Sequence, residues 1–353
     1  MKILFISHKF NPDVGGIESH SENLVGYLSE KGEEIHLITW SKASGDQAPF
    51  PYKVIRNPSF FKLVQEFIWA EVIFENNPTL KLSWLNYLFG KPHIIVLHTW
   101  ISRSNGKIGL KDRFKLKYLR KADAVIAVSK KLREATFKKA IIIHNSYNQI
   151  LFRRKKEVVK NKDFVFLGRL VSDKGADMAI QLLKKLNEIE ENPNKYSLSI
   201  IGDGNEKTNL EKLVKENNLE EWVEFTGVLT NERLVQKLNE HKYILIPSRW
   251  KEPFGLVALE GMACGCLPIV SDGGGLPEAI GKAGIVFNRN NEAELLGTVK
   301  ELLNSPQMEL TIRTAMSTHL KKHHRETISN KYHQIIKNLL DEKYQVNPLA
   351  SHR

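Results

Sequence analysis

The sequence predicts an α/β protein built from two doubly wound domains that face each other across a cleft. The first observation is that short apolar runs alternate with helical patterns along the whole 353-residue chain, which is typical of parallel βαβ units. The second is that this alternation breaks once, over residues 146–162, where the chain is charged, lacks periodicity and is typical of a linker. A chain of this length is also too long for one ordinary domain and suits two.

The elements follow from the apolar runs in chain order. The first domain, expected over residues 1–155, has six runs that predict strands, at 2–7, 34–40, 71–76, 93–98, 124–129 and 140–145. The second domain, expected over 161–325, has six more, at 163–170, 196–204, 222–227, 243–247, 267–272 and 284–287. Helical patterns lie between them, for instance over 177–190 and 205–217, and from about Pro306 the chain is helical and basic.

The composition excludes several classes of protein. The 42% apolar and 26% charged fractions are ordinary for a globular protein, and no apolar run is long enough to span a bilayer. The chain starts directly in strand-like sequence without a cleavable leader, which favours a cytoplasmic location. Cys264 and Cys266 are separated by one residue, too close for an ordinary disulfide and too few for structural zinc. We expect them to be reduced, buried thiols.

The positive charge is concentrated in one segment. The whole chain carries a formal charge of +12, yet residues 103–162 alone hold 19 Lys and Arg against 4 Asp and Glu. Such a field attracts anionic partners, but no nucleic-acid-binding motif accompanies it. We therefore expect contact with an anionic membrane surface, at the inner face of the cell membrane, or with a pyrophosphate-linked lipid. The stripe Leu110, Phe114 and Tyr118 predicts a helix packed on its sheet with a solvated basic face.

The most informative stretch is Pro247 to Glu278. A predicted strand leads through Pro253 and Gly255 into a helix start, and unpaired N–H groups there favour an anion. Glu252 and Glu260 bracket the apolar run between them. Because an ionised carboxylate only accepts hydrogen bonds, two of them beside an anion site indicate a ligand that also carries hydroxyls. A nucleotide sugar has this chemistry.

Further candidate residues follow other predicted strands. Gly168, Arg169 and Lys174 end the first strand of the second domain, where the two cations would neutralise a diphosphate without a metal. A solvated surface loop is the alternative. The pair Gly15 and Gly16 predicts close approach of a phosphate or simply a turn.

His98 and the glycines of residues 202–204 each have a structural interpretation as well. His98 ends a strand, where a structural role and a sugar contact are equally supported. Gly202 and Gly204 lack the third glycine of a dinucleotide-binding loop, so loop geometry is the first interpretation and proximity to the ligand the second.

Together these motifs resemble the retaining GT-B glycosyltransferases of family 4, the group 1 glycosyltransferases. The resemblance rests on glycines 15–16, GRL with KG over 168–175, GDG at 202–204, FTG at 225–227 and the block 247–278, and it covers essentially the whole chain. It implies two Rossmann-like domains and a helical tail, 326–353, that returns toward the first domain. It also implies a metal-independent hexosyltransferase with no cofactor, because the nucleoside-diphosphate sugar is its donor substrate.

The resemblance also implies the roles of the site residues. Arg169 and Lys174 would hold the donor diphosphate and stabilise its developing charge. Glu252 would bind donor-sugar hydroxyls, and Glu260 the ribose hydroxyls. The remaining contacts would come from backbone N–H groups and neighbouring positions: Phe254, Gly255 and Leu256 at sugar and phosphate, Gly227 and Val228 near the base, Gly16 near the phosphates, and His98 near the sugar.

The donor and acceptor stay open at this stage. A UDP-sugar is favoured and GDP-mannose is the alternative; the acceptor would be a hydroxyl of a glycan or lipid-linked molecule in cell-surface polysaccharide or glycolipid synthesis. Thr99 stands where the family often has Asp, and residues 145–148 lack a glycine and a carboxylate common there, which affects the acceptor side. The alternative functions are a two-lobed nucleotide-sugar epimerase and a non-catalytic basic module that binds nucleic acid or membrane; a dinucleotide-dependent oxidoreductase is more distant.

Overall fold

The computed structural model describes residues 1–13, 15–43, 49–79, 85–101, 109–188 and 195–346. The chain divides into two compact units. Unit 1 comprises Met1–Tyr147 together with His324–Arg353, and unit 2 comprises Asn148–His323. The tail therefore belongs to unit 1, where α14 (Arg325–Val346) contacts α1 (Gly16–Glu30). Residues 347–353 of the predicted tail lie outside the described residues.

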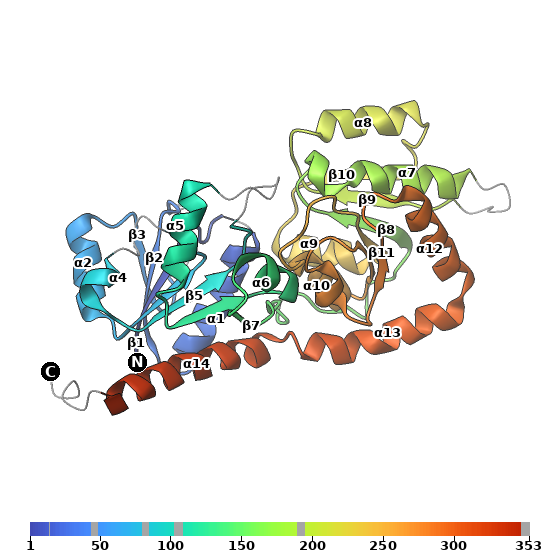
Figure 1. The fold of residues 1–353 in the computed structure, drawn as a ribbon. Coiled ribbons are helices and arrows are strands. Elements are labelled where there is room, and N and C mark those ends of the chain that lie inside the picture. Colours follow the sequence, from blue (N-terminus) through green and yellow to red (C-terminus); the bar gives the residue numbers. More distant parts are fainter. Residues whose placement is uncertain (14, 44–48, 80–84, 102–108, 189–194, 347–353) are drawn as a thin grey trace. The chain divides into compact units, whose positions relative to one another are not determined.

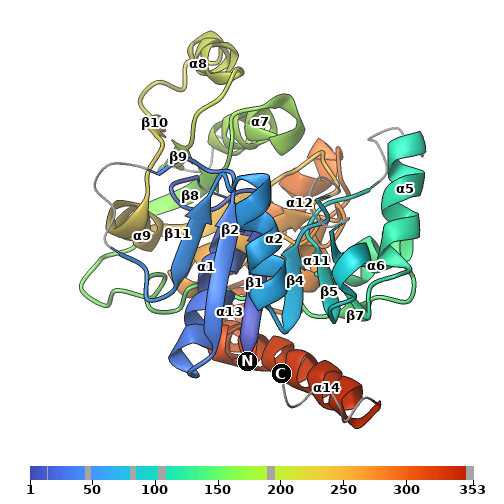
Figure 2. The same cartoon turned by 90° about the vertical axis from the view of Figure 1, so that its left-hand side faces the viewer.

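Unit 1 contains a parallel sheet in the order β3-β2-β1-β4-β5-β6-β7. Figure 2 shows β2, β1, β4 and β5 next to one another in this order. The strands are β1 (Lys2–Ser7), β2 (Glu34–Thr39), β3 (Lys53–Arg56), β4 (Val72–Asn76), β5 (His93–Leu97), β6 (Ala124–Ala127) and β7 (Ile141–Ile142). Besides α1 and α14, its described helices are α2 (Phe60–Trp69), α4 (Asn86–Phe89), α5 (Leu110–Leu119) and α6 (Lys130–Thr136). Every residue of β4 and β5 is buried, as expected of parallel strands covered on both faces.

Unit 2 repeats the arrangement with the strand order β10-β9-β8-β11-β12-β13. Figure 1 shows the first four of these strands, β10, β9, β8 and β11. Its strands are β8 (Lys162–Leu167), β9 (Leu198–Ile201), β10 (Val223–Gly227), β11 (His241–Ile246), β12 (Leu267–Ser271) and β13 (Ile285–Phe287). Its helical elements are η1 (Ser172–Lys174), α7 (Ala176–Asn187), α8 (Lys207–Glu216), α9 (Asn231–Asn239), α10 (Leu256–Ala263), α11 (Leu276–Ile280), α12 (Glu292–Asn304) and α13 (Pro306–Lys321). Both sheets are doubly wound, which confirms the predicted fold class.

The strand order places one switch point in each unit. The order reverses between β1 and β4 in unit 1, and between β8 and β11 in unit 2. Loops that leave two neighbouring strands at such a point diverge to opposite sides of the sheet, and ligands of doubly wound folds bind there. In unit 2 these are the loops that carry Arg169, Lys174 and Glu252.

Some boundaries differ from those expected. Unit 2 begins at Asn148 rather than after residue 155, because the intervening segment bonds to the unit 2 fold. Arg154 Nη1 and the Lys155 backbone N–H donate to Asn239 Oδ1 at 2.9 and 2.8 Å, and Lys160 Nζ donates to Cys264 O at 3.1 Å. In unit 1, β3 has no counterpart among the predicted strands, and the run 140–145 yields the two-residue β7.

The basic segment 103–162 is divided between the two units. Residues 103–108 lie outside the described residues. From Asn148 onward the chain belongs to unit 2, where Lys155 and Lys162 pair with Glu232 and Glu224. The unit 1 part of the basic segment therefore consists of α5, α6 and the residues around them.

The packing of α5 also differs from the prediction. Tyr118 is buried and its hydroxyl donates to Glu75 Oε2 at 3.0 Å, but Leu110 and Phe114 are 75% and 64% exposed. The helix thus packs on unit 1 through its last turn, and the predicted stripe is wrong for its first two members. Spacing predicts which side chains share a face, but not how much of the face finds a partner.

The cysteines are as expected. Cys264 and Cys266 are buried and unpaired, and burial raises the pKa of both thiols. Within the described ranges, no helix combines the length and the apolar character that crossing a membrane requires.

Candidate active site

The centre of the candidate site in unit 2 is formed by the loops that follow β8 and β11. These strands pair in parallel, with Phe166 beside Leu245, so their carboxyl ends lie next to each other. The first loop runs from Gly168 to Gly175 and the second from Pro247 to Gly255. Adjacent strands therefore bring together residues that are about 80 positions apart in the chain.

Lys174 and Glu252 form an ion pair between these loops. Lys174 Nζ lies 2.5 Å from Glu252 Oε1, and Ser248 Oγ donates to the same oxygen at 2.9 Å. The side chains keep 22% and 14% exposure. The structure thus joins two predicted site residues into one partly buried charged group, which solvent still reaches.

Gly175 permits this approach of the two loops. It has φ 76°, in the left-handed region, and a Cβ there would lie 2.2 Å from the carbonyl oxygen of Pro247. Glycine is the residue that adopts this conformation without steric cost. The position after Lys174 is thus constrained by the backbone of the neighbouring loop.

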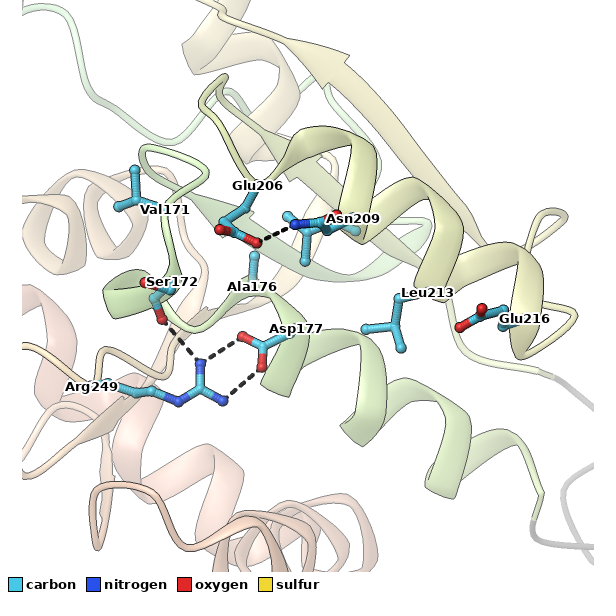
Figure 3. A pocket seen from close by; sticks show the side chains of 10 residues that line it. Val171, Ser172, Ala176, Asp177, Glu206, Asn209, Leu213, Glu216 and Arg249 are labelled. Carbon is cyan, nitrogen blue, oxygen red and sulfur yellow. Dashed lines mark hydrogen bonds and ion pairs between the residues drawn. The ribbon is translucent and has the colours of Figure 1, made fainter.

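A second set of contacts links the same two loops, in addition to the Lys174–Glu252 ion pair. The carbonyl of Asp173 accepts from the backbone N–H groups of Arg249 and Trp250 at 2.8 and 3.0 Å. The Arg249 guanidinium binds Asp177 through two bonds of 2.6 and 2.7 Å and donates to Ser172 O at 3.2 Å (Figure 3). A bidentate pair of this kind fixes geometry as well as charge.

The third loop, between β12 and α11, holds the backbone of Glu252. Gly275 N–H donates to Glu252 O at 2.7 Å, and Gly274 bridges to the same residue. Gly274 has φ 72°, and a Cβ there would lie 2.1 Å from Glu252 O. Glu252 is therefore positioned by its backbone on one side and by Lys174 and Ser248 on the other.

Helix α10 starts beside this group. Gly255 is its N-cap with φ 116°, and no side chain caps the helix there. A Cβ on Gly255 would lie 2.5 Å from Leu276 Cδ2. The Phe254 side chain is buried, with its ring 5.7 Å from that of His323, so what this residue can offer a ligand is its backbone.

Glu260 lies further along α10, in a different environment from Glu252. It is partly exposed, and no side-chain partner is found for it within the described part of the chain. Burial by the surrounding protein atoms raises the pKa of its carboxyl group from 4.5 to about 7. Such a group is ready to accept hydrogen bonds from hydroxyls, and near neutral pH it exists in both protonation states.

This pKa leads to a prediction for stability. Because the folded pKa of about 7 lies above the unfolded value, the contribution of Glu260 is fully present below about pH 4 and is lost as the pH rises to about 7. We expect Glu260→Gln to remove this loss and to be more stable than the wild type at pH 8 by on the order of 2 kcal/mol. Urea unfolding of both proteins at pH 5 and pH 8 measures it. If the free energies of unfolding of the two proteins differed by the same amount at both pH values, the raised pKa of Glu260 would be contradicted.

Arg169 is exposed and has no side-chain partner among the residues that the structure describes. Its loop rests on the GDG loop that follows β9: Leu170 N–H donates to Asp203 O at 2.9 Å. A Cβ on Gly202 or Gly204 would lie 1.9 or 2.2 Å from the carbonyl oxygen of Gly168 or Leu170. The two GDG glycines are therefore explained by loop packing, the first of the two interpretations offered for them.

Two further predicted residues follow β10, next to the GDG loop. Gly227 has φ 71° with open space around its Cα, and its carbonyl accepts from Gly202 N–H at 2.9 Å. Val228 is 64% exposed. An exposed apolar side chain beside an open glycine is suited to the flat face of a base.

The other predicted residues belong to unit 1. Gly15 is the N-cap of α1 and Gly16 its first residue, with no side-chain cap, and among the described residues no atom lies within 4 Å of a Cβ built on Gly16. His98 follows β5, is 5% exposed and has Nε2 2.6 Å from Asn76 Oδ1. Burial and the neighbouring ring of His20, whose centroid is 4.6 Å away, hold the pKa of His98 well below its usual value.

A pocket of about 360 Å³ lies between α7, α8 and the 171–177 segment (Figure 3). Its lining includes Asp177, Glu206 and Glu216, and its one cation, Arg249, is already paired with Asp177. A lining of this charge repels a diphosphate, and it contains none of the predicted site residues. We therefore do not assign the donor to this pocket.

Several contact residues were missing from the sequence prediction. Ser248, Arg249 and Asp177 hold the Lys174–Glu252 pair and its loops, and Asn76 holds His98. A signal was available for Asn76, because polar residues at the ends of neighbouring strands meet at one edge of a sheet. No local signal links Arg249 with Asp177, which lies 72 positions away. In the described ranges, no cluster of three or more His, Cys, Asp or Glu side chains is arranged to hold a metal ion.

Comparison with known proteins agrees with this arrangement. Residues 148–322 match the family described as Glycosyl transferases group 1, and residues 14–145 match Glycosyltransferase Family 4. An uncharacterised glycosyltransferase of Methanocaldococcus jannaschii is 29% identical, over 88% of this chain and 91% of its own length.

Solved structures show the same fold. The Anabaena protein HepE, in complex with UDP-glucose, superposes with a TM-score of 0.80 at 20% identity, covering 96% of this chain and all of its own. Sucrose-phosphate synthase of Thermosynechococcus elongatus superposes with a TM-score of 0.79 at 20% identity, covering 97% and 99% of the two chains. The chain thus belongs to the group 1 glycosyltransferases of family 4 and is a glycosyltransferase with the GT-B fold.

Proposed function

We propose that this glycosyltransferase moves a hexose from a nucleoside-diphosphate sugar, with a UDP-sugar favoured over GDP-mannose, to a hydroxyl of a glycan or lipid-linked acceptor. The observation that carries the proposal is the Lys174–Glu252 pair, in which a cation and a carboxylate lie 2.5 Å apart beside a helix N-terminus without a side-chain cap. A sugar diphosphate needs both, because its phosphates require positive charge and its sugar requires acceptors.

Each group then has a defined task. Arg169 and Lys174 bind the diphosphate, and the first N–H groups of α10, at Gly255 and Leu256, add a positive dipole. Glu252 accepts from hydroxyls of the sugar, and Glu260 accepts from hydroxyls of the ribose. Gly227 and Val228 border the base. From unit 1, Gly15 and Gly16 contribute backbone N–H groups to the phosphates and His98 contacts the sugar.

The reaction proceeds with retention, which family membership supports. The bond between sugar C1 and the β-phosphate oxygen breaks, and its electron pair stays with the nucleoside diphosphate. The acceptor oxygen bonds to C1 on the face that the diphosphate leaves, and its proton passes to the β-phosphate. The cations Arg169 and Lys174 stabilise the charge that develops on the leaving group, which is usually the largest catalytic contribution. They do so without a metal ion.

The UDP donor is supported by the complex of HepE with UDP-glucose. Thermal unfolding in the presence of UDP-, GDP- and ADP-sugars tests this, because a ligand that binds the folded state raises its apparent stability. We expect UDP-sugars to give the largest rise.

The reaction class is tested by assaying released UDP with Glu252→Ala. We expect turnover with UDP-glucose to fall by at least about 100-fold while circular dichroism shows an unchanged fold. Glu206→Ala, which removes a carboxylate of the side pocket, is the matched control and should keep its activity. An epimerase would instead isomerise the donor without releasing UDP, and a binding module would show no dependence on Glu252.

We further propose that unit 1 docks on the anionic inner face of the cell membrane, where a lipid-linked acceptor would lie. Leu110 and Phe114 are exposed on α5, interleaved with the exposed cations Lys111, Arg113 and Lys117. Apolar side chains that insert and cations that attract anionic lipid together suit a membrane surface.

Vesicle flotation tests the docking. Wild-type protein should float with anionic vesicles and should not float with neutral ones. Salt at 0.5 M should reduce flotation with anionic vesicles, because the Debye screening length is then only about 4–5 Å. Replacing Leu110 and Phe114 by Asn should weaken flotation several-fold. Leu310→Asn, at a residue of unit 2 that is 60% exposed, is the matched control. Equal binding to neutral and anionic vesicles at low salt would contradict the proposal.

A further inference from the structure

His98 and Asn76 form a buried hydrogen bond at the ends of neighbouring strands of unit 1. Asn76 is the last residue of β4 and His98 follows β5, which pairs with β4 in parallel. Asn76 Oδ1 lies 2.6 Å from His98 Nε2, and the two residues are 0% and 5% exposed. A bond this short between buried groups restricts where protons can be placed.

The orientation of the Asn76 amide follows from its other partners. Asn76 Nδ2 lies 3.1 Å from the carbonyl oxygen of Ile17 and 2.6 Å from Ser21 Oγ, both on α1. A carbonyl oxygen only accepts hydrogen bonds, so the atom facing Ile17 must be the amide nitrogen. The amide oxygen therefore faces His98. Because that oxygen also only accepts, His98 Nε2 must carry a hydrogen and donate it.

The His98 ring holds a single proton. Burial and the neighbouring His20 keep its pKa well below the usual range, so the ring is neutral at physiological pH. With the proton on Nε2, the lone pair is on Nδ1. No partner for Nδ1 is found among the described residues. The ring therefore presents an acceptor and not a donor.

We propose that Asn76 is a positioning residue that holds His98 as the Nε2–H tautomer, so that His98 Nδ1 accepts a hydrogen bond from one hydroxyl of the donor sugar. The same amide is anchored to Ile17 and Ser21 in the first turns of α1, the helix that begins at Gly16. The sugar contact at His98 and the phosphate contact at Gly16 are thereby held by one network. The hydroxyl contact rests on the proposed function; the tautomer does not.

The tautomer is tested without any substrate, by 15N NMR of the histidine rings in the full-length wild-type protein. Loss of one set of signals in His98→Gln assigns His98. We expect Nε2 to have the shift of a protonated nitrogen and Nδ1 that of an unprotonated one, unchanged between pH 6 and pH 8. A proton on Nδ1, or titration in this range, would overturn the proposal.

Two variants separate positioning from a merely structural role. Asn76→Leu removes the acceptor, so the His98 ring should become a mixture of tautomers. Ser21→Ala leaves the Ile17 carbonyl in place, so the amide and the Nε2–H tautomer should be retained. If Asn76→Leu fails to fold, Asn76→Asp serves in its place. The carboxylate of Asp has no N–H to donate to the Ile17 carbonyl, and its negative charge should raise the pKa of His98. Identical ring spectra in wild type and both Asn76 variants would overturn the role of Asn76.

The hydroxyl contact is tested with UDP-glucose and its monodeoxy analogues. Removal of one of the sugar hydroxyls should lower kcat/KM of the wild type by about 10- to 100-fold, because the acceptor His98 Nδ1 is then left without a hydrogen bond. In Asn76→Leu, removal of the same hydroxyl should lower kcat/KM by less than about 5-fold. Equal kcat/KM for UDP-glucose and all its deoxy analogues would overturn the contact. Absence of turnover with UDP-glucose itself would contradict the proposed function, while the tautomer would still be decided by NMR.

Discussion

Replacing Lys174 by Gln is expected to lower kcat with a UDP-sugar by about 10²–10³-fold, with little effect on the fold. In the proposed reaction the ammonium group stabilises the negative charge that develops on the leaving diphosphate, and a neutral amide cannot do so. In the free protein the same substitution leaves Glu252 without its cation, although Ser248 still donates to it. Steady-state kinetics of UDP release measure the effect.

The matched control for this substitution is Lys185→Gln. Lys185 is also a lysine paired with a glutamate, Glu292, at 3.1 Å, but it lies in the last turn of α7 and both side chains are about 40% exposed. Exposed ion pairs contribute little, so its activity and stability should stay near those of the wild type. If Lys174→Gln and Lys185→Gln retained the same kcat, the role of Lys174 in charge stabilisation would be wrong.

Gly175→Ala is expected to lower both the stability and the activity of the protein strongly. The residue has φ 76°, and the new Cβ would lie 2.2 Å from the Pro247 carbonyl oxygen, which is backbone and cannot rotate away. The strain alone costs about 1–3 kcal/mol, and relieving the clash must separate the Lys174 loop from the Glu252 loop. Denaturant unfolding and UDP-release kinetics measure the two effects.

Gly32→Ala separates backbone strain from the collision. Gly32 has a similar φ of 83°, but no atom lies within 4 Å of a Cβ built there. It should lose about 1 kcal/mol of stability and keep its activity. An equal loss in both variants would show that the contact between the two loops contributes nothing beyond the conformational strain.

The sequence predicted the architecture because the burial of parallel strands leaves a strong local signal. β1, β4 and β5 are apolar runs bounded by polar residues, and each was expected within one residue of its observed limits. β3 gave no such signal, because Lys53 and Arg56 enclose only two apolar residues. Its strand character comes from pairing with β2 at the sheet edge.

The candidate site was predicted residue by residue, but its internal contacts were not. Residue type and position at strand ends pointed to Arg169, Lys174 and Glu252. The bidentate ion pair of Arg249 with Asp177, in contrast, depends on how two loops far apart in the sequence pack against each other. The burial of α5 is a similar case: the spacing of Leu110 and Phe114 was read correctly, but whether any element covers them is a property of the whole fold.

The central claim is that unit 2 binds a nucleoside-diphosphate sugar through Arg169, Lys174, Glu252 and Glu260 without a metal ion. Isothermal titration of UDP-glucose into wild-type protein in the presence of EDTA tests it most directly. The account predicts saturable binding at one site, weakened at least about 100-fold in the Arg169→Gln, Lys174→Gln double variant and unchanged in Lys185→Gln. Binding that requires a divalent cation, or that is equal in the wild type and the double variant, would contradict it.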